Sequence, residues 1–188
     1  MKPLLVAAVV LSSAGLTSPA YAAGDQPRWE HRYVCMKIKK NVHKSWQVRR
    51  VARVWNQHQN HVKLRAKRSC KDARQKIVVR TYARQDNRGG YVDWKRWYFP
   101  QEQGTPVYLK RGVVYHNRLE YRGSSPCVKS SLAAHEIGHA LGLDHIDTTR
   151  PATLMGKRRG VYHYNQKRCG KLGRQDIRLI NRTYNVTR

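Results

Sequence analysis

Three histidines in the C-terminal half of the chain have the spacing of a metal site. His135 and His139 are four residues apart, so on a helix their imidazoles project from one face, one turn apart. Two such imidazoles can bind one tetrahedral zinc ion, and a third protein ligand leaves the fourth position open for water. His145, six residues beyond His139, is the candidate for that third ligand.

The third ligand requires the chain to turn after the second one. A helix that continued past His139 would carry His145 away from the ion. Gly142 lies between them, and glycine readily adopts the left-handed conformation that ends a helix and turns the chain back. We therefore expect the helix to end at Gly142 and His145 to return to the metal.

A carboxylate stands beside the predicted metal ligands. Glu136 follows His135 directly and should point beside the metal, where a general base acts on zinc-activated water. Zinc lowers the pKa of water from 15.7 toward about 7, so a carboxylate can take the proton while the oxygen attacks a carbonyl carbon. The same carboxyl can then protonate a leaving amine. The pattern predicts metal-assisted hydrolysis of a peptide bond, with Glu136 as the catalytic residue.

The surrounding sequence predicts the elements that would position these residues. Alternating or β-rich segments predict strands, and apolar positions at helical spacing predict helices. Ser130 or Ser131 is the expected cap of the metal-binding helix, and residues 24–31 are expected to form a loose arm. The predicted strands are 32–40, 62–67, 76–82, 94–99, 107–110 and 113–117, and the predicted helices are 42–59, about 131–141 and 174–184. Mixed strands and helices followed by helices indicate an α+β domain.

The N-terminus has the features of an export signal. Lys2 precedes a short apolar stretch over residues 4–16, and Ala20-Tyr21-Ala22 matches a signal-peptidase site. The stretch is too short to span a bilayer, and no second one follows. We expect a signal peptide over residues 1–22, a single catalytic domain over residues 23–188, and secretion.

The cysteine count fits an oxidising compartment. Cys35, Cys70, Cys127 and Cys169 allow three disulfide connectivities. We favour Cys35–Cys70 with Cys127–Cys169, because each pair then joins neighbouring segments. No C-x-x-C pair is present, which argues against a cysteine-type zinc site.

The charge is extreme for a chain of 188 residues. With 38 Lys and Arg against 11 Asp and Glu, the net charge is +27. Such a surface attracts polyanions, such as acidic wall polymers, anionic membranes or acidic proteins, although a merely solvated basic surface is an equal interpretation. No nucleic-acid-binding motif accompanies the charge, so no specific nucleic acid is expected. The few, unclustered acidic residues also make structural calcium unexpected.

The segment from His135 to His145, H-E-I-G-H-A-L-G-L-D-H, resembles the zinc motif of the metzincins, and most closely that of the matrixin branch. Ala152-Thr153-Leu154-Met155-Gly156 resembles that family's methionine turn, with Met155 beneath the metal. The resemblance implies a metzincin-like zincin fold. This fold has a twisted, mostly parallel sheet with an antiparallel edge strand, an active-site helix and a C-terminal helix. It also implies an upper lobe over about 32–142 and a small lower lobe over about 143–188.

The expected function is that of a secreted, monomeric zinc endopeptidase with one catalytic ion, acting on protein or peptide substrates. An extended substrate would add to an edge strand, with 94–99 and 107–110 as the two candidates. The alternative function is a catalytically weak or inactive cationic protein that binds anionic polymers on the same scaffold. That alternative is motivated by the charge alone.

Overall fold

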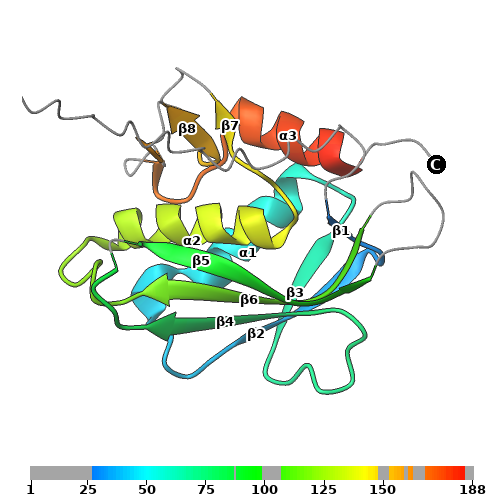
Figure 1. Ribbon diagram of the computed structural model, residues 1–188, viewed down its shortest axis with the longest axis horizontal. Helices are drawn as coiled ribbons and strands as arrows, with labels where there is room; N and C mark the ends of the chain where they lie inside the picture. The colour runs from blue at the N-terminus through cyan, green and yellow to red at the C-terminus, as the bar shows by residue number, and fades with distance from the viewer. Residues whose placement is uncertain are drawn as a thin grey trace, which may run out of the picture.

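The computed structural model describes residues 27–86, 88–98, 107–147, 153–158, 161–162 and 168–184. A twisted six-stranded sheet carries helices on one face, and a second, three-stranded sheet with the last helix lies beyond them (Figure 1). The segment with the predicted metal ligands lies between these two parts, because it occupies the helix directly above the large sheet and the turn that leaves it. This arrangement confirms the predicted α+β fold.

The large sheet is parallel except for one strand. Along the sheet the order is β6-β4-β2-β3; β1 pairs with the start of β6 on the same edge as β4, and β5 pairs with the opposite edge of β6. Only β5 runs antiparallel, and within the described residues it has β6 as its one partner, which makes it the antiparallel edge strand. The strands are β1 Arg28–Trp29, β2 Tyr33–Ile38, β3 Lys63–Lys67, β4 Lys76–Tyr82, β5 Gly90–Tyr98 and β6 Tyr108–Asn117.

Three α-helices complete the described part of the chain. A short 3₁₀-helix, η1 (Lys44–Trp46), precedes α1 (Val48–His58), and α2 (Pro126–Ala140) packs beside α1 over the sheet. The last helix, α3 (Arg174–Tyr184), follows the small sheet. That sheet consists of β7 Ile146–Asp147, β8 Gly156–Arg158 and β9 Val161–Tyr162.

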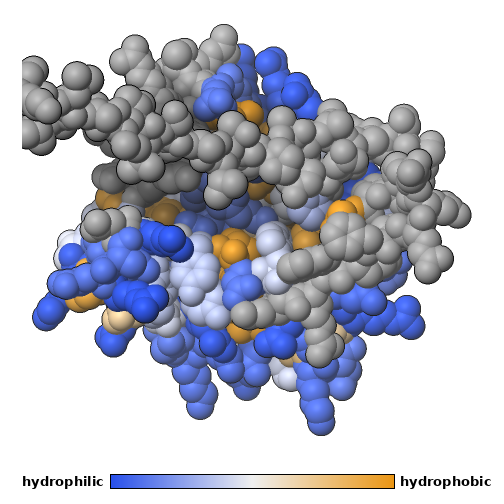
Figure 2. Space-filling view, in the orientation of Figure 1, coloured by the Kyte–Doolittle hydropathy of each residue, from blue (hydrophilic) through white to orange (hydrophobic). Residues whose placement is uncertain are grey.

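Side-chain alternation along the strands separates a core face from a basic outer face. Ile77 and Val79 of β4 are fully buried against the helices, whereas Lys76 and Arg80 point to the other side and are only partly buried. Hydrophilic residues accordingly project from the side of the molecule that lies below the sheet in Figure 2. On the core side, the Trp55 indole of α1 is completely buried and donates a hydrogen bond to Ala134 O at 3.1 Å, which ties α1 to α2.

Several element boundaries differ from the sequence-based expectation. The metal-binding helix begins five residues earlier than predicted, because Ser125 is its cap and Pro126 occupies its first turn. The proposed caps Ser130 and Ser131 are therefore wrong, and both are buried inside the helix. The two strands expected over 107–110 and 113–117 form one continuous strand, β6.

The expected N-terminal arm contains a short strand. Arg28 and Trp29 pair with the start of β6, and Trp29 is 97 % buried in the core. A two-residue strand has too little pattern for sequence analysis to detect, so this element was missed.

Two disulfides fasten the ends of long connections. Cys35 of β2 is bonded to Cys70, which follows β3, and Cys127 in the first turn of α2 is bonded to Cys169, which precedes α3. This is the pairing that the sequence analysis favoured. No helix among the described residues is long and apolar enough to cross a membrane.

His116 of β6 makes stability depend on pH. Its ring is completely buried and stacked on Trp46 at 4.5 Å, and within the described residues neither ring nitrogen has a hydrogen-bond partner. Burial lowers the pKa of His116 to about 3. The unfolded chain protonates this histidine near pH 6.5 and the folded chain does not, so its contribution to stability is complete above pH 6.5 and declines as the pH falls.

We predict that acidification from pH 7 to pH 4 destabilises the protein by about 3 kcal/mol more than it destabilises the His116→Phe variant. Phenylalanine keeps a ring on Trp46 and cannot take up a proton. Urea unfolding at a series of pH values measures the difference. Parallel stability curves for the two proteins would contradict the assignment.

Candidate metal centre

The three predicted histidines come together at the end of α2. The Nε2 atom of His139 lies 3.1 Å from Nε2 of His135 and 3.1 Å from Nε2 of His145, and the remaining pair is 3.3 Å apart. His135 and His139 come from the last two turns of α2, whereas His145 comes from the turn that follows. The sequence thus correctly predicted that these imidazoles meet.

Backbone carbonyls set the tautomers of two of these rings. His135 Nδ1 lies 2.6 Å from Leu154 O, and His139 Nδ1 lies 2.8 Å from Leu143 O. A carbonyl oxygen only accepts, so each Nδ1 must carry the hydrogen and each Nε2 presents a lone pair. Carbonyl partners of this kind are typical of metal-binding histidines, because they fix the ring orientation and raise the basicity of the ligand atom.

The converging lone pairs fit a tetrahedral cation. Imidazole nitrogens at roughly 2.0–2.1 Å from one zinc ion would stand about 3.3–3.4 Å apart, close to the observed 3.1–3.3 Å. Burial lowers the pKa of both His135 and His139, so the neutral, metal-binding form is favoured at neutral pH. Among the described residues, these three histidines form the one cluster of His, Cys, Asp or Glu side chains whose ligand atoms lie close enough together to hold a metal ion.

The turn that returns His145 to the cluster depends on a glycine. Gly142 has a φ of +87°, in the left-handed region. A Cβ at this position would also overlap the carbonyl oxygen of Pro27, so both backbone conformation and space require glycine. The carbonyls that the helix end leaves without a partner inside the helix accept from elsewhere: Trp29 Nε1 donates to Ala140 O at 2.8 Å, and Tyr184 Oη donates to Leu141 O at 2.8 Å.

The segment around Met155 contacts α2 and is held by a buried carboxylate. Asp176 of α3 accepts hydrogen bonds from the backbone N–H groups of Leu154 and Met155, each at 3.0 Å, and from Gly173 N at 2.7 Å. Burial raises the pKa of Asp176, although these hydrogen bonds oppose the rise. Because Leu154 O in turn accepts from His135, Asp176 positions a histidine that it does not touch.

Met155 itself is fully buried against α2. A Cβ at Gly138 would lie 2.5 Å from Met155 Sδ and 3.1 Å from the Trp55 ring, so the absence of a side chain at Gly138 lets the methionine approach the helix. Gly138 stands between His135 and His139 on that helix. Met155 O also accepts from Ile146 N at 2.8 Å, which fixes the residue next to His145.

Glu136 is buried beside the edge strand. It is 4 % exposed, and its Oε2 has no hydrogen-bond partner among the described residues. Desolvation by burial raises the pKa of Glu136 to about 8. A Cβ at Gly90 of β5 would lie 2.9 Å from both Cγ and Oε1 of Glu136, so the glycine at the start of the edge strand makes room for this carboxylate.

Comparison with known proteins decides the family. The model of the matrixin peptidases matches residues 28–185, which is most of the chain. The chain belongs to the matrixin family. A search of curated proteins finds no match. The three histidines have the spacing of this family's zinc-binding motif, so family membership and the histidine geometry agree.

Sequence analysis of this matrixin found the histidines and missed the residues that support them. Gly90 lay outside the predicted strands, and Asp176 had no role beyond its place in the last predicted helix. Trp29 was placed in a loose arm. Each acts through a partner distant in the sequence, such as Glu136 for Gly90 or Leu154 for Asp176, and periodicity within one segment contains no signal for such contacts.

We predict that Asp176→Asn weakens zinc binding by about tenfold to hundredfold, because one of the two oxygens that accept from the turn that orients His135 becomes an NH2 donor. Hydrogen bonds to a charged group contribute about 1.5–3 kcal/mol each, so the free energy of unfolding should also fall by about 2–3 kcal/mol. Titration of the metal-free protein with zinc and urea unfolding measure the two effects.

The matched control is Asp72→Asn, which removes an exposed carboxylate far along the chain from the turn. Asp72→Asn should leave the zinc affinity and the free energy of unfolding unchanged. Equal zinc affinities for Asp176→Asn and Asp72→Asn would show that Asp176 does not position the histidine.

Proposed function

We propose that this protein is a secreted zinc-dependent endopeptidase in which His135, His139 and His145 bind one zinc ion and Glu136 acts as the general base. One observation carries the proposal: three Nε2 atoms converge within 3.1–3.3 Å, with the Nδ1 atoms of His135 and His139 committed to carbonyl oxygens. Membership of the matrixin family supports a zinc metallopeptidase at the level of the reaction class.

The residues of the chain have separate tasks in this reaction. Zinc, when bound, supplies a Lewis acid that lowers the pKa of water toward about 7 and polarises the substrate carbonyl. Glu136 accepts the proton as the water oxygen attacks the carbonyl carbon, and then gives that proton to the leaving amine nitrogen. Its unpartnered Oε2 is the atom available for both transfers.

The burial of Glu136 prevents it from acting as a base unless a positive charge lies nearby. With a pKa of about 8, the carboxyl would hold its proton at neutral pH and could not serve as a base. A positive charge nearby favours the ionised form and lowers that pKa. The neighbouring histidine cluster is where a divalent cation would supply this charge, so we expect Glu136 to become a base only in the metal-loaded protein.

The edge strand offers a place for the substrate. Of the two candidates from the sequence, 107–110 belongs to β6, which pairs with β1 on one side and β5 on the other. The remaining candidate lies in β5, whose outer edge has no partner strand among the described residues. An extended peptide can add to such an edge through backbone hydrogen bonds. Because β5 begins at Gly90, beside Glu136, a bound peptide would run close to the catalytic carboxylate.

Among the described residues, the two disulfides are the feature that supports secretion. Two disulfides indicate an oxidising compartment. The proposed signal peptide, residues 1–22, lies outside the described residues, and the proposed catalytic domain comprises 23–188. Two expectations remain predictions from the sequence: that the protein binds no structural calcium and that it is a monomer.

We predict that Glu136→Gln retains zinc and loses peptide hydrolysis, with kcat lower by about 10²–10⁴-fold, because glutamine cannot accept the proton. Cleavage of a generic protein substrate and zinc content per chain should be measured on the same preparations. Glu120→Gln, which neutralises an exposed glutamate, is the matched control and should retain full activity.

Unchanged hydrolysis by Glu136→Gln would overturn the assigned base. If the wild-type protein binds zinc and hydrolyses no peptide, the alternative of an inactive cationic protein on the matrixin scaffold is correct instead.

A further inference from the structure

A strongly basic cavity lies away from the histidines. It has a volume of about 560 Å³ and lies between α1 and the segment that precedes α3. Arg50, Arg53 and His58 of α1 form one wall, and Arg168 and Lys171 form the other. We call this cavity the basic groove. None of its lining residues belongs to the metal centre.

The charge of the basic groove is not balanced by its own lining. Four permanently charged cations line it, and no aspartate or glutamate is among the lining residues that the structure describes. The Arg168 charge does act on Asp176, but that carboxylate is fully buried and already accepts from three backbone N–H groups. Like charges around one cavity repel each other, and an anion bound there relieves the repulsion.

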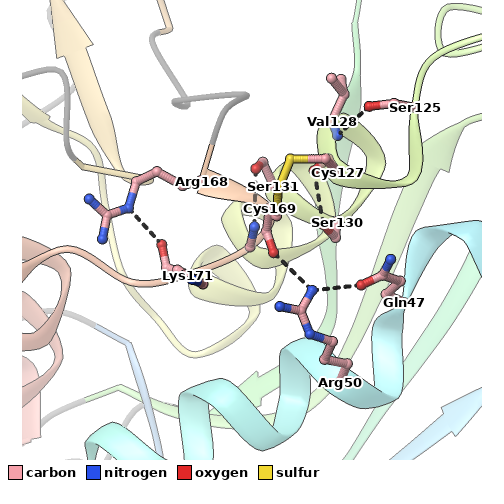
Figure 3. The surroundings of a disulfide bond; sticks show 11 residues. Gln47, Arg50, Ser125, Cys127, Val128, Ser130, Ser131, Arg168, Cys169 and Lys171 are labelled. Atoms are coloured by element: carbon pink, nitrogen blue, oxygen red, sulfur yellow. Dashed lines mark hydrogen bonds between the residues drawn. A yellow bond between two sulfur atoms is a disulfide. The ribbon is translucent and has the colours of Figure 1, made fainter.

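Hydrogen bonds to the backbone fix two of the arginines. Arg50 Nη1 donates to Gln47 Oε1 at 2.7 Å and to Cys169 O at 3.1 Å, so it connects α1 with the opposite wall (Figure 3). Arg168 donates from Nε to Lys171 O at 3.0 Å and from Nη2 to Leu172 O at 2.8 Å. These two arginines are therefore held in place before any ligand arrives, which reduces the entropic cost of binding.

The wall formed by residues 168–172 is itself fastened to α2. Cys169 is bonded to Cys127, and Gly170 N donates to Ser131 Oγ at 3.1 Å (Figure 3). Cys169 and Gly170 both have positive φ, at 51° and 77°, and a Cβ at Gly170 would lie 2.9 Å from Ser130 O. This tight turn places Arg168 and Lys171 opposite α1, so the fold determines the position of both walls of the groove.

We propose that the basic groove binds the phosphate groups of a linear polyanion that carries no bases. Guanidinium groups match phosphate oxygens in geometry as well as in charge. Among the lining residues that the structure describes, the apolar ones are Val54 and Leu172, and none is a Trp, Tyr or Phe on which a base could stack. Arg53 and Lys171 are exposed, which leaves the groove open to a passing chain. This inference does not depend on the proposed peptidase activity.

The test uses the full mature chain and short inorganic polyphosphate as the probe. Arg53→Gln/Lys171→Gln removes two charges from the groove and none of the side-chain hydrogen bonds described above. Arg118→Gln/Arg122→Gln removes two exposed charges from the connection between β6 and α2, and it is the matched control. The dissociation constant of each protein is measured over a series of NaCl concentrations.

Each lost phosphate contact reduces the slope of log K against log salt by about 0.7 in a single-stranded polyanion. The groove variant should therefore show a slope smaller by about 1.4 and, at about 0.1 M salt, affinity weaker on the order of tenfold. The control should remain within about twofold of the wild type. Arg53→Lys/Lys171→Arg, which keeps both charges, should bind as the wild type does.

Equal losses in the groove and control variants would overturn the proposal, because binding would then follow net charge alone. Single-stranded DNA is the second probe. If it binds more tightly than polyphosphate and is the ligand whose binding falls in the groove variant, the proposed class of ligand is wrong.

Discussion

The metal centre depends on hydrogen bonds between imidazole rings and backbone carbonyls. Leu154 O and Leu143 O hold the Nδ1 hydrogens of His135 and His139, so the opposite nitrogens present lone pairs to one another at 3.1 Å. Facing lone pairs repel each other, and a cation bound between them replaces this repulsion with attraction. The fold therefore maintains an arrangement that becomes favourable when a positive ion binds, and folding and metal binding should be thermodynamically coupled.

The supports of this centre come from every part of the chain. Trp29 near the N-terminus and Tyr184 at the end of α3 satisfy the last carbonyls of α2, while Asp176 fixes the turn that contains Met155. The same segment that leads into α3 also forms one wall of the basic groove, through Arg168 and Lys171. A short region thus contributes to two sites of different chemistry, one selecting a cation and the other an anion.

The sequence predicted the metal ligands and the disulfide pairing, and it missed the helix cap and the residues that support the metal ligands. The spacing of His135, Glu136, His139, Gly142 and His145 lies within one helix and its terminus, where the geometry of a helical turn relates residue number directly to position. The helix cap was misplaced, because Ser130 and Ser131 are polar residues that α2 buries, whereas the Ser125-Pro126 pair begins the helix. The role of Gly90 depends on its contact with Glu136, 46 residues away in the chain. The role of Asp176 depends on its hydrogen bond with Leu154, 22 residues away. Neither role could be predicted, because sequence patterns contain no signal for such distant contacts.

The number of imidazoles around the ion is the central property of the proposed metal centre. X-ray absorption spectroscopy at the zinc edge of the zinc-loaded protein measures this most directly. We expect three imidazole nitrogens and one further light ligand, at roughly 2.0–2.1 Å. Two imidazoles, or a spectrum unchanged by His145→Ala, would show that the turn at Gly142 does not bring the third histidine to the metal.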